Sequence, residues 1–186
     1  KMKNLNALET SKDFYENRYK KGYMEKWPED KKDRVYGVIR SLNLPHEGEG
    51  LDFGCGNGVF TEMLKKALPN WNIYGCDLSE VAVENAKKIN KDCIFFESND
   101  AGLKDKKFDF VFSHHVLEHV FDIDATAKEI TEKLNPTSSM LHILPCGNEG
   151  SFEHQLCSLR KDGINKDMGN KFFFEDEGHI RRMTTK

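Results

Sequence analysis

Apolar positions along the chain follow two different spacings, and together they predict alternating helices and strands. Helical spacing occurs in five segments: 10–21, 28–42, 57–68, 80–89 and 123–134. Short apolar runs predict strands just before Gly54 and at 71–76, 93–96, 108–112 and 140–144. The connections are short, so we predict an α/β fold: an open, mostly parallel sheet with helices on both faces and ligands at the carboxyl ends of its strands.

Local signals set several boundaries of these elements. Pro28 suits the first turn of a helix, and Ser79 is a plausible N-cap for the helix 80–89. Asn135 and Pro136 should stop the helix that begins near residue 123 and leave a strand at 140–144. The run 108–112 is the clearest strand, apolar enough to be buried on both faces.

A glycine-rich turn, 51–60, joins the first strand to a helix and is the first candidate site. Gly54, Gly56 and Gly58 lie two residues apart, so the backbone can turn sharply and approach a ligand. A dinucleotide fingerprint would need a small residue at Val59. Asp52 would repel a pyrophosphate but attract an ammonium group, as on the methionine half of S-adenosylmethionine (SAM). A tight turn that binds no ligand is the alternative.

This turn resembles the first motif of the class I SAM-dependent methyltransferases, Asp/Glu-x-Gly-x-Gly-x-Gly. The run 117–120, Leu-Glu-His-Val, also resembles the segment that follows their fourth strand. The resemblance implies a Rossmann-like sheet of seven strands in the order 3-2-1-4-5-7-6. Only five strands are visible here, because the sequence after Gly150 is polar and irregular. Strands six and seven are therefore expected to be missing, because the sequence is truncated, because the protein continues beyond Lys186, or because the fold is a reduced one.

Further residues should contact the cofactor. Asp77 ends the second strand, 21 residues after Gly56, where a carboxylate can accept hydrogen bonds from ribose hydroxyls. The resemblance implies that Asp100 and Ala101 read the adenine. It also places four other residues at the cofactor: Leu78, Asn99, Ser113 and His114.

Histidines beside the expected methyl donor are candidate catalytic groups. Most oxygen and nitrogen acceptors lose a proton on methylation, and histidine titrates near working pH. His115 is our first choice as the base, with His119 as a second catalytic candidate. The alternative is that these imidazoles only orient or pack against their neighbours.

The same histidines raise the question of a metal. His115 to His119 matches His-x-x-Glu-His, a zinc motif that must lie within a long helix, whereas here it follows a strand. Some related methyltransferases for small RNAs and ubiquinone precursors bind a divalent ion through Glu-x-x-Glu-His. The first position here is His115 instead of Glu, so a divalent metal is possible but not favoured.

Composition narrows the class of protein. The length of 186 residues fits one domain, and 28 basic and 31 acidic residues are interspersed at a net charge of -3, so no nucleic-acid partner is expected. Five cysteines without a Cys-x-x-Cys pair suggest reduced thiols and a cytoplasmic protein. No apolar run approaches 18 residues and no leader is visible, so no membrane partner is expected.

These observations predict the organisation and the reaction. Residues 1–45, rich in aromatic side chains, are expected to form a helical lid, and 46–186 the SAM-binding domain. The expected activity is O- or N-methylation of a small molecule, with S-adenosylhomocysteine (SAH) as product. Arg181 and Arg182 near the aromatic run 172–174 suggest an anionic metabolite or sugar derivative as acceptor. A non-catalytic SAM-binding protein and a nicotinamide-dependent oxidoreductase are the alternatives.

Overall fold

The computed structural model describes residues 2–148, 150–152, 155, 164–165, 171–172 and 183–184. Its helices are α1 (Met2–Lys20), α2 (Glu29–Ser41), α3 (Val59–Ala67), α4 (Glu80–Ile89), α5 (Ala101–Lys104) and α6 (Ile123–Glu132). Its strands are β1 (Glu49–Phe53), β2 (Asn72–Asp77), β3 (Ile94–Glu97), β4 (Phe108–His114), β5 (Leu134–Ile143), β6 (Ile164–Asn165) and β7 (Lys171–Phe172). Strands and helices alternate as the sequence predicts.

Five strands form one parallel sheet in the order β3-β2-β1-β4-β5. This confirms the predicted fold class, and the strand order agrees with the first five positions of the expected order. The short strands β6 and β7 pair antiparallel in a separate sheet. Within the described residues, no further strand joins the five-stranded sheet.

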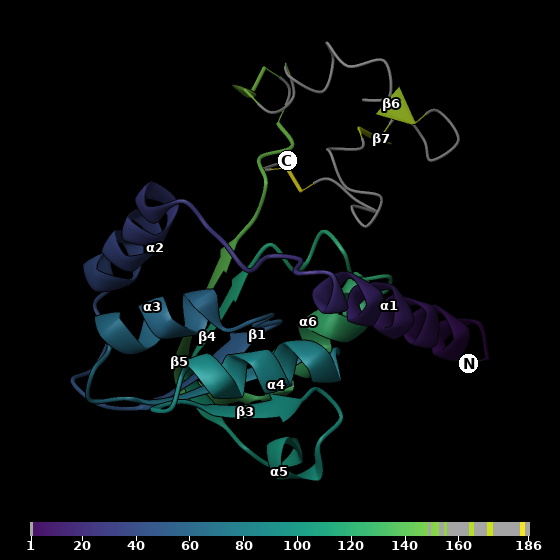
Figure 1. Cartoon of the computed structure of the whole chain (residues 1–186). Helices are drawn as coiled ribbons and strands as arrows, with labels where there is room; N and C mark the ends of the chain where they lie inside the picture. Colours follow the sequence, from purple (N-terminus) through teal and green to yellow (C-terminus); the bar gives the residue numbers. More distant parts are fainter. Residues whose placement is uncertain are drawn as a thin grey trace.

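Helices cover both faces of the sheet (Figure 1). On one face, α2 and α3 pack against Trp71, Ile73 and Phe110, and α4 continues the same layer toward β3. On the other face, α5 and α6 pack against side chains that include Val111 and Cys76. Successive side chains of a strand point to opposite faces, so strands buried on both sides are apolar throughout, as 108–112 is.

The last strand of the sheet differs from its prediction. β5 begins at Leu134, so the predicted strand 140–144 is only the second half of a longer one, and Asn135 and Pro136 lie inside it. The pairing between β4 and β5 shifts register between Phe108 and Phe110. Asn135 Nδ2 donates to Asp109 Oδ1 at 2.7 Å across this irregularity. A proline is tolerated there because β5 is an edge strand and the pairing is already interrupted.

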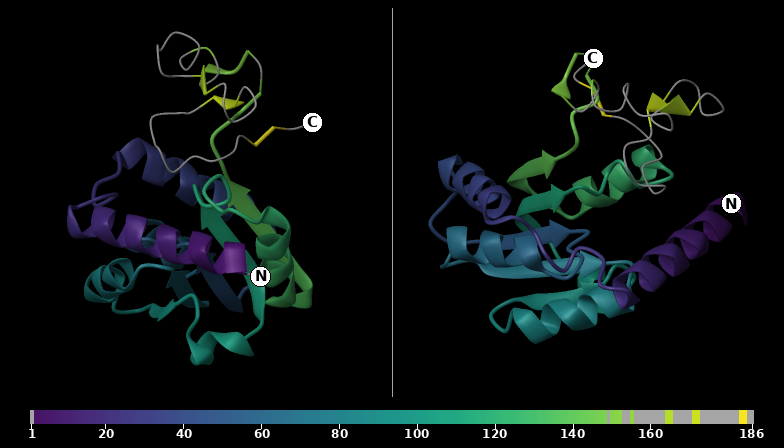
Figure 2. Two further views of the ribbon diagram at one scale, coloured as in Figure 1. Left: turned by 90° about the vertical axis from the view of Figure 1, so that its right-hand side faces the viewer. Right: turned by 45° about the horizontal axis from the view of Figure 1, so that its top comes forward.

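Helix α1 lies outside these two layers. It crosses the carboxyl edge of the sheet beside the start of α4, as the left view of Figure 2 shows. Its side chains from residue 11 onward contact the last residue of β3 and the segments that follow β1, β2 and β4. Among the described helices, none has the length and hydropathy needed to cross a membrane.

Candidate functional site

Two neighbouring cavities lie under α1 at the carboxyl edge, where the strand order reverses between β1 and β4. The larger, of about 370 Å³, is bordered by Asp77, Leu78 and Ser98 on the sheet side. The smaller, of about 70 Å³, is bordered by Asp52 and the glycine turn. Five residues line both cavities: Tyr15, Tyr19, Gly54, His115 and His119. A reversal of strand order is where open α/β sheets bind their ligands.

The glycine turn has the backbone that its sequence predicts. Gly54 and Gly56 have φ angles of 77° and 51°. A Cβ at Gly54 would lie 2.5 Å from Val116 Cγ2, and one at Gly56 would lie 2.7 Å from Tyr19 Oη, so a side chain fits at neither position. Gly58 instead starts α3 and packs on α4, where its Cβ would meet Asn90. The first two glycines thus shape the cavities, and the third joins two helices.

Asp52 is buried at the end of β1 and lines the smaller cavity. Its Oδ2 accepts a hydrogen bond of 2.6 Å from Thr61 Oγ1 on α3. Burial raises the pKa of Asp52 to about 7, although the hydrogen bond from Thr61 opposes the shift. A carboxyl group that titrates near neutrality would lose its proton and become negative beside an ammonium ligand. The hypothesis that Asp52 attracts the ammonium group of SAM requires this negative charge.

Asp77 is held by backbone donors on both of its oxygens. Oδ2 accepts from the Gly56 N–H and Oδ1 from the Ser79 N–H, each at 2.9 Å. Burial raises the pKa of Asp77, while the N–H groups of Ser79, Gly56 and Leu78 lower it. An ionised carboxylate has about four acceptor sites, so lone pairs remain for hydroxyl groups in the larger cavity. Both the position and the chemistry fit a ribose.

The residues predicted to read adenine lie differently. Asp100 is exposed and caps α5, with Oδ1 accepting from the Gly102 N–H at 2.7 Å. Ala101 begins that helix, and neither residue lines a described cavity; the same is true of Asn99. Ser98 lines the larger cavity instead. Contact of Asp100 and Ala101 with adenine therefore stays a prediction. Ser98 could have been proposed from sequence, since it directly follows β3.

Two further predicted cofactor residues have packing partners. Ser113 is fully buried within β4, where its Oγ lies 2.7 Å from His142 Nδ1 on β5, and it lines neither cavity. His114 lies in an aromatic stack, 3.9 Å from the ring centre of Phe60 and 4.4 Å from that of His115. Burial lowers the pKa of His114 to about 3, so it is a neutral wall of the smaller cavity.

His115 combines a strained backbone with a buried acid partner. Its φ angle of 55° is left-handed, and its N–H donates to Ile143 O at 2.9 Å. Nδ1 lies 3.4 Å from Oε1 of the buried Glu118, which the sequence marked only as the acid of the possible metal motif. Burial lowers the pKa of His115 to about 4, with further lowering by Lys31 and His119. The imidazole is thus neutral and has a lone pair for a proton, but its pKa lies below the range near working pH that made histidine the candidate base.

His119 completes the group of ionisable side chains between the cavities. Its Nε2 lies 4.0 Å from Glu118 Oε1, and its ring meets Tyr15 edge-on at 5.6 Å. The segment from His115 to His119 is a turn, so it does not satisfy the helical zinc motif. Within the described part of the chain, no three His, Cys, Asp or Glu side chains are arranged to hold a metal ion.

Aromatic residues of the N-terminal segment form much of the wall opposite the sheet. Tyr15, Tyr19, Tyr23 and Trp27 all line the smaller cavity, and Trp27 meets His114 edge-on at 5.1 Å. Met24 also lines it, with a left-handed φ of 58°. The sequence marked this segment as aromatic but did not assign individual residues to the site. Arg181 and Arg182 lie outside the described residues.

Comparison with known proteins gives a family match over the middle of the chain. Residues 51–139 match a family model described as a methyltransferase domain. A malonyl-[acyl-carrier protein] O-methyltransferase from Priestia megaterium is 29% identical over 68% of this chain and 49% of its own length. A ubiquinone biosynthesis O-methyltransferase from Pelagibacter ubique is 36% identical over 55% of this chain and 44% of its own length. The chain thus spans about half the length of these curated relatives.

Solved structures support the fold. A DhpI–SAM–HEP complex superposes with a TM-score of 0.61 at 19% identity, covering 87% of this chain and 75% of that one. The PH0226 protein from Pyrococcus horikoshii has a TM-score of 0.56 at 19% identity, covering 65% of this chain and 56% of that one. The glycine turn, Asp77 at the end of β2 and all of β4 lie within residues 51–139, so the part of the chain that builds the candidate site is the part that matches the methyltransferase-domain model.

Proposed function

We propose that this protein transfers a methyl group from SAM to an oxygen or nitrogen atom of a small molecule. The observation that carries the proposal is the pair of neighbouring cavities whose linings share His115. One contains the carboxylate of Asp77 and the other that of Asp52. An elongated cofactor with a ribose at one end and an ammonium group at the other would match this arrangement.

The chain's own residues would hold SAM by complementary chemistry. Asp77 would accept hydrogen bonds from the ribose hydroxyls, and Asp52 would face the ammonium group across the turn of Gly54 and Gly56. Tyr15 and Tyr19 line both cavities and would exclude water from the region between them. When bound, SAM would supply an electrophilic methyl group on its sulfonium.

We propose that His115 takes the proton that the acceptor loses on methylation. Its Nδ1 lies near Glu118, so Nε2 is the ring nitrogen available to an acceptor. An ionised Glu118 would favour the imidazolium form of His115 once Nε2 has taken the proton. His119, on the same wall, is the second candidate for this role.

The acceptor we propose is a small anionic metabolite or sugar derivative. The support is the sequence pair Arg181 and Arg182, because arginine offers paired donors to phosphate and carboxylate. The interspersed charges of the chain favour a small molecule over a nucleic acid.

Two measurements test the proposal. Calorimetry with SAM, SAH and NAD should show binding of the first two only; binding of NAD alone would favour an oxidoreductase. Incubation with methyl-labelled SAM and a cell-extract metabolite fraction should then yield a labelled small product. Binding of SAM without transfer to any fraction would favour the non-catalytic alternative.

A further inference from the structure

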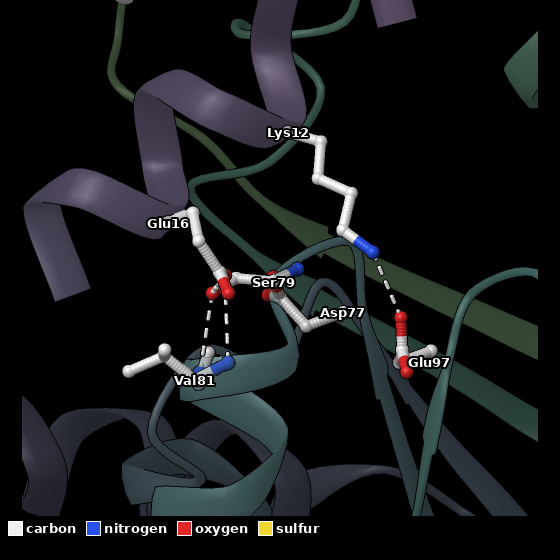
Figure 3. Close-up of polar contacts among 7 residues, drawn as sticks. Lys12, Glu16, Asp77, Ser79, Val81 and Glu97 are labelled. Carbon is white, nitrogen blue, oxygen red and sulfur yellow. Dashed lines mark hydrogen bonds and ion pairs between the residues drawn. The ribbon is translucent and has the colours of Figure 1, made fainter. Parts of the chain in front are cut away.

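Helix α1 is fastened to the sheet edge by two polar contacts on either side of Asp77 (Figure 3). Glu16 Oε2 accepts a hydrogen bond from Ser79 Oγ and a longer one, 3.4 Å, from the Val81 N–H. Lys12 Nζ lies 2.9 Å from Glu97 Oε2 at the end of β3. These partners follow β2 and end β3, so α1 is tied to the strand ends that border the larger cavity.

Ser79 connects the first contact to the proposed ribose carboxylate. Its N–H donates to Asp77 Oδ1 at 2.9 Å, while its Oγ accepts from the Ala82 N–H at 3.2 Å and donates to Glu16. One fully buried residue thus holds both carboxylates. If Glu16 left, Ser79 would lose one partner, and the N-cap that orients Asp77 would be less constrained.

Electrostatic interactions with α4 stabilise the negative charge of Glu16 in this position. It lies against the first turn of α4, where free N–H groups and the helix dipole favour a negative charge. Repulsion between Glu16 and Asp77 opposes this attraction, and it adds to burial in raising the pKa of Asp77. The free energy of this contact is therefore the difference between the attraction to α4 and the repulsion from Asp77, and a substitution nearby can change it.

We propose that Glu16 is a positioning residue for the cofactor: it closes α1 over the larger cavity and, through Ser79, fixes the Asp77 carboxylate, with the Lys12–Glu97 pair as a second fastening. The inference rests on the proposed function, since it names the residue that controls access to the same site. Glu16 does not line the cavity, but Ser11, Tyr15 and Tyr19 of the same helix do. Movement of α1 away from the sheet would therefore widen the larger cavity and speed release of the cofactor.

The first test measures the dissociation rate of SAH by stopped flow. Glu16→Ala should raise this rate about tenfold or more, the scale of losing a hydrogen bond to a charged group. Glu16→Gln keeps an acceptor without the charge and should fall between the parent and Glu16→Ala. Asp13→Ala removes an exposed acid from the same helix and should stay within about twofold of the parent. An unchanged rate for Glu16→Ala would overturn the proposal.

The second test needs no cofactor. Hydrogen exchange of residues 11–24 should be faster in Glu16→Ala than in the parent or in Asp13→Ala, while exchange of β1 and β4 stays unchanged. Unchanged exchange of residues 11–24 would show that Glu16 does not hold α1. If the parent protein itself fails to bind SAH, the proposed function fails, and this measurement still decides whether the fastening exists.

A charge exchange tests the second fastening. Lys12→Glu and Glu97→Lys should each speed hydrogen exchange of residues 11–24, because each replaces the attraction between Lys12 Nζ and Glu97 Oε2, now 2.9 Å apart, by repulsion between like charges. The double variant restores opposite charges and should return the exchange rate toward that of the parent. A double variant as fast as the faster single variant would remove the Lys12–Glu97 pair from the proposal.

Discussion

The N–H of Gly56 donates to Asp77 Oδ2 at 2.9 Å, although the two residues are 21 positions apart; Gly56 lies in the turn after β1, and Asp77 ends β2. The glycine turn and the acid after β2 are therefore one unit. A change at Asp77 acts on both the proposed ribose contact and the shape of the turn.

Replacement of Asp77 by alanine should weaken SAM binding by about 1–3 kcal/mol, because ribose hydroxyls lose a charged acceptor and the Gly56 N–H loses its partner. Calorimetry measures the difference. Asp105→Ala, which removes the acid after α5, is a matched control and should bind as the parent does. Equal affinity for Asp77→Ala would show that Asp77 does not hold the cofactor.

Replacement of His115 by alanine should lower the rate of methyl transfer about 10²-fold or more, since that is the scale of general-base catalysis. SAH affinity should stay within a few fold, because Asp52 and Asp77 are retained. His46→Ala removes an exposed imidazole and should leave the rate unchanged. An unaffected rate in His115→Ala would transfer the base to His119 or to no side chain.

Asp52 should make the stability of the free protein depend on pH. Its pKa is raised by burial to about 7 from an ordinary value of 3.8, so the folded state holds a proton that the unfolded state releases. This contribution is present below about pH 4 and is lost as pH rises through about 7. Urea unfolding should therefore show the parent losing stability, relative to Asp52→Asn, between about pH 4 and about pH 7, with the loss levelling off at higher pH. Parallel pH profiles for the two proteins would contradict the assignment.

The same carboxyl group should release a proton when a ligand with an ammonium group binds. Near pH 6.5 a fraction of Asp52 is protonated, and a neighbouring cation favours the ionised form. Calorimetry of SAH in two buffers of different ionisation enthalpy measures this release. The parent should release protons and Asp52→Asn should release fewer; equal values would place the ammonium group away from Asp52.

Exchange of Arg181 and Arg182 for glutamine should raise the KM for the acceptor at least about tenfold, because paired donors to an anion are lost. The KM for SAM should change little. The acceptor used is the one isolated from the labelled-product screen. A neutral or macromolecular acceptor, or an unchanged KM, would refute the anionic-acceptor proposal.

Features that depend on local sequence could be predicted. The glycines of the turn and the cap at Ser79 act through their own backbone or a neighbouring one. Asp77 can be recognised as the acid that ends β2 and accepts from the Ser79 N–H, although it also accepts from Gly56, 21 positions away. The alternation of strands and helices followed from apolar spacing alone. The fold was therefore accessible from sequence, whereas the cofactor contacts of Asp52 and Asp77 stay predictions.

Contacts between distant segments could not be predicted in the same way. Glu16 and Ser79 are 63 positions apart, and the spacing of α1 shows only that it has an apolar side. Asp100 illustrates a different difficulty, since an acid after a strand can serve a ligand or cap the next helix, and here it caps α5. β5 begins earlier than the apolar run 140–144 from which it was predicted, because Leu134 already pairs with Phe108.

The left-handed backbone at His115 also restricts which residues natural variation can place there. A residue other than glycine pays about 1–3 kcal/mol to adopt that conformation. Asparagine and histidine adopt it more readily than β-branched residues, as His115 does here. Proteins that keep this turn but take the acceptor proton elsewhere should therefore carry glycine or asparagine at this position and avoid valine and isoleucine. A survey of relatives would then distinguish lineages that keep the imidazole for its chemistry from those that keep only the turn.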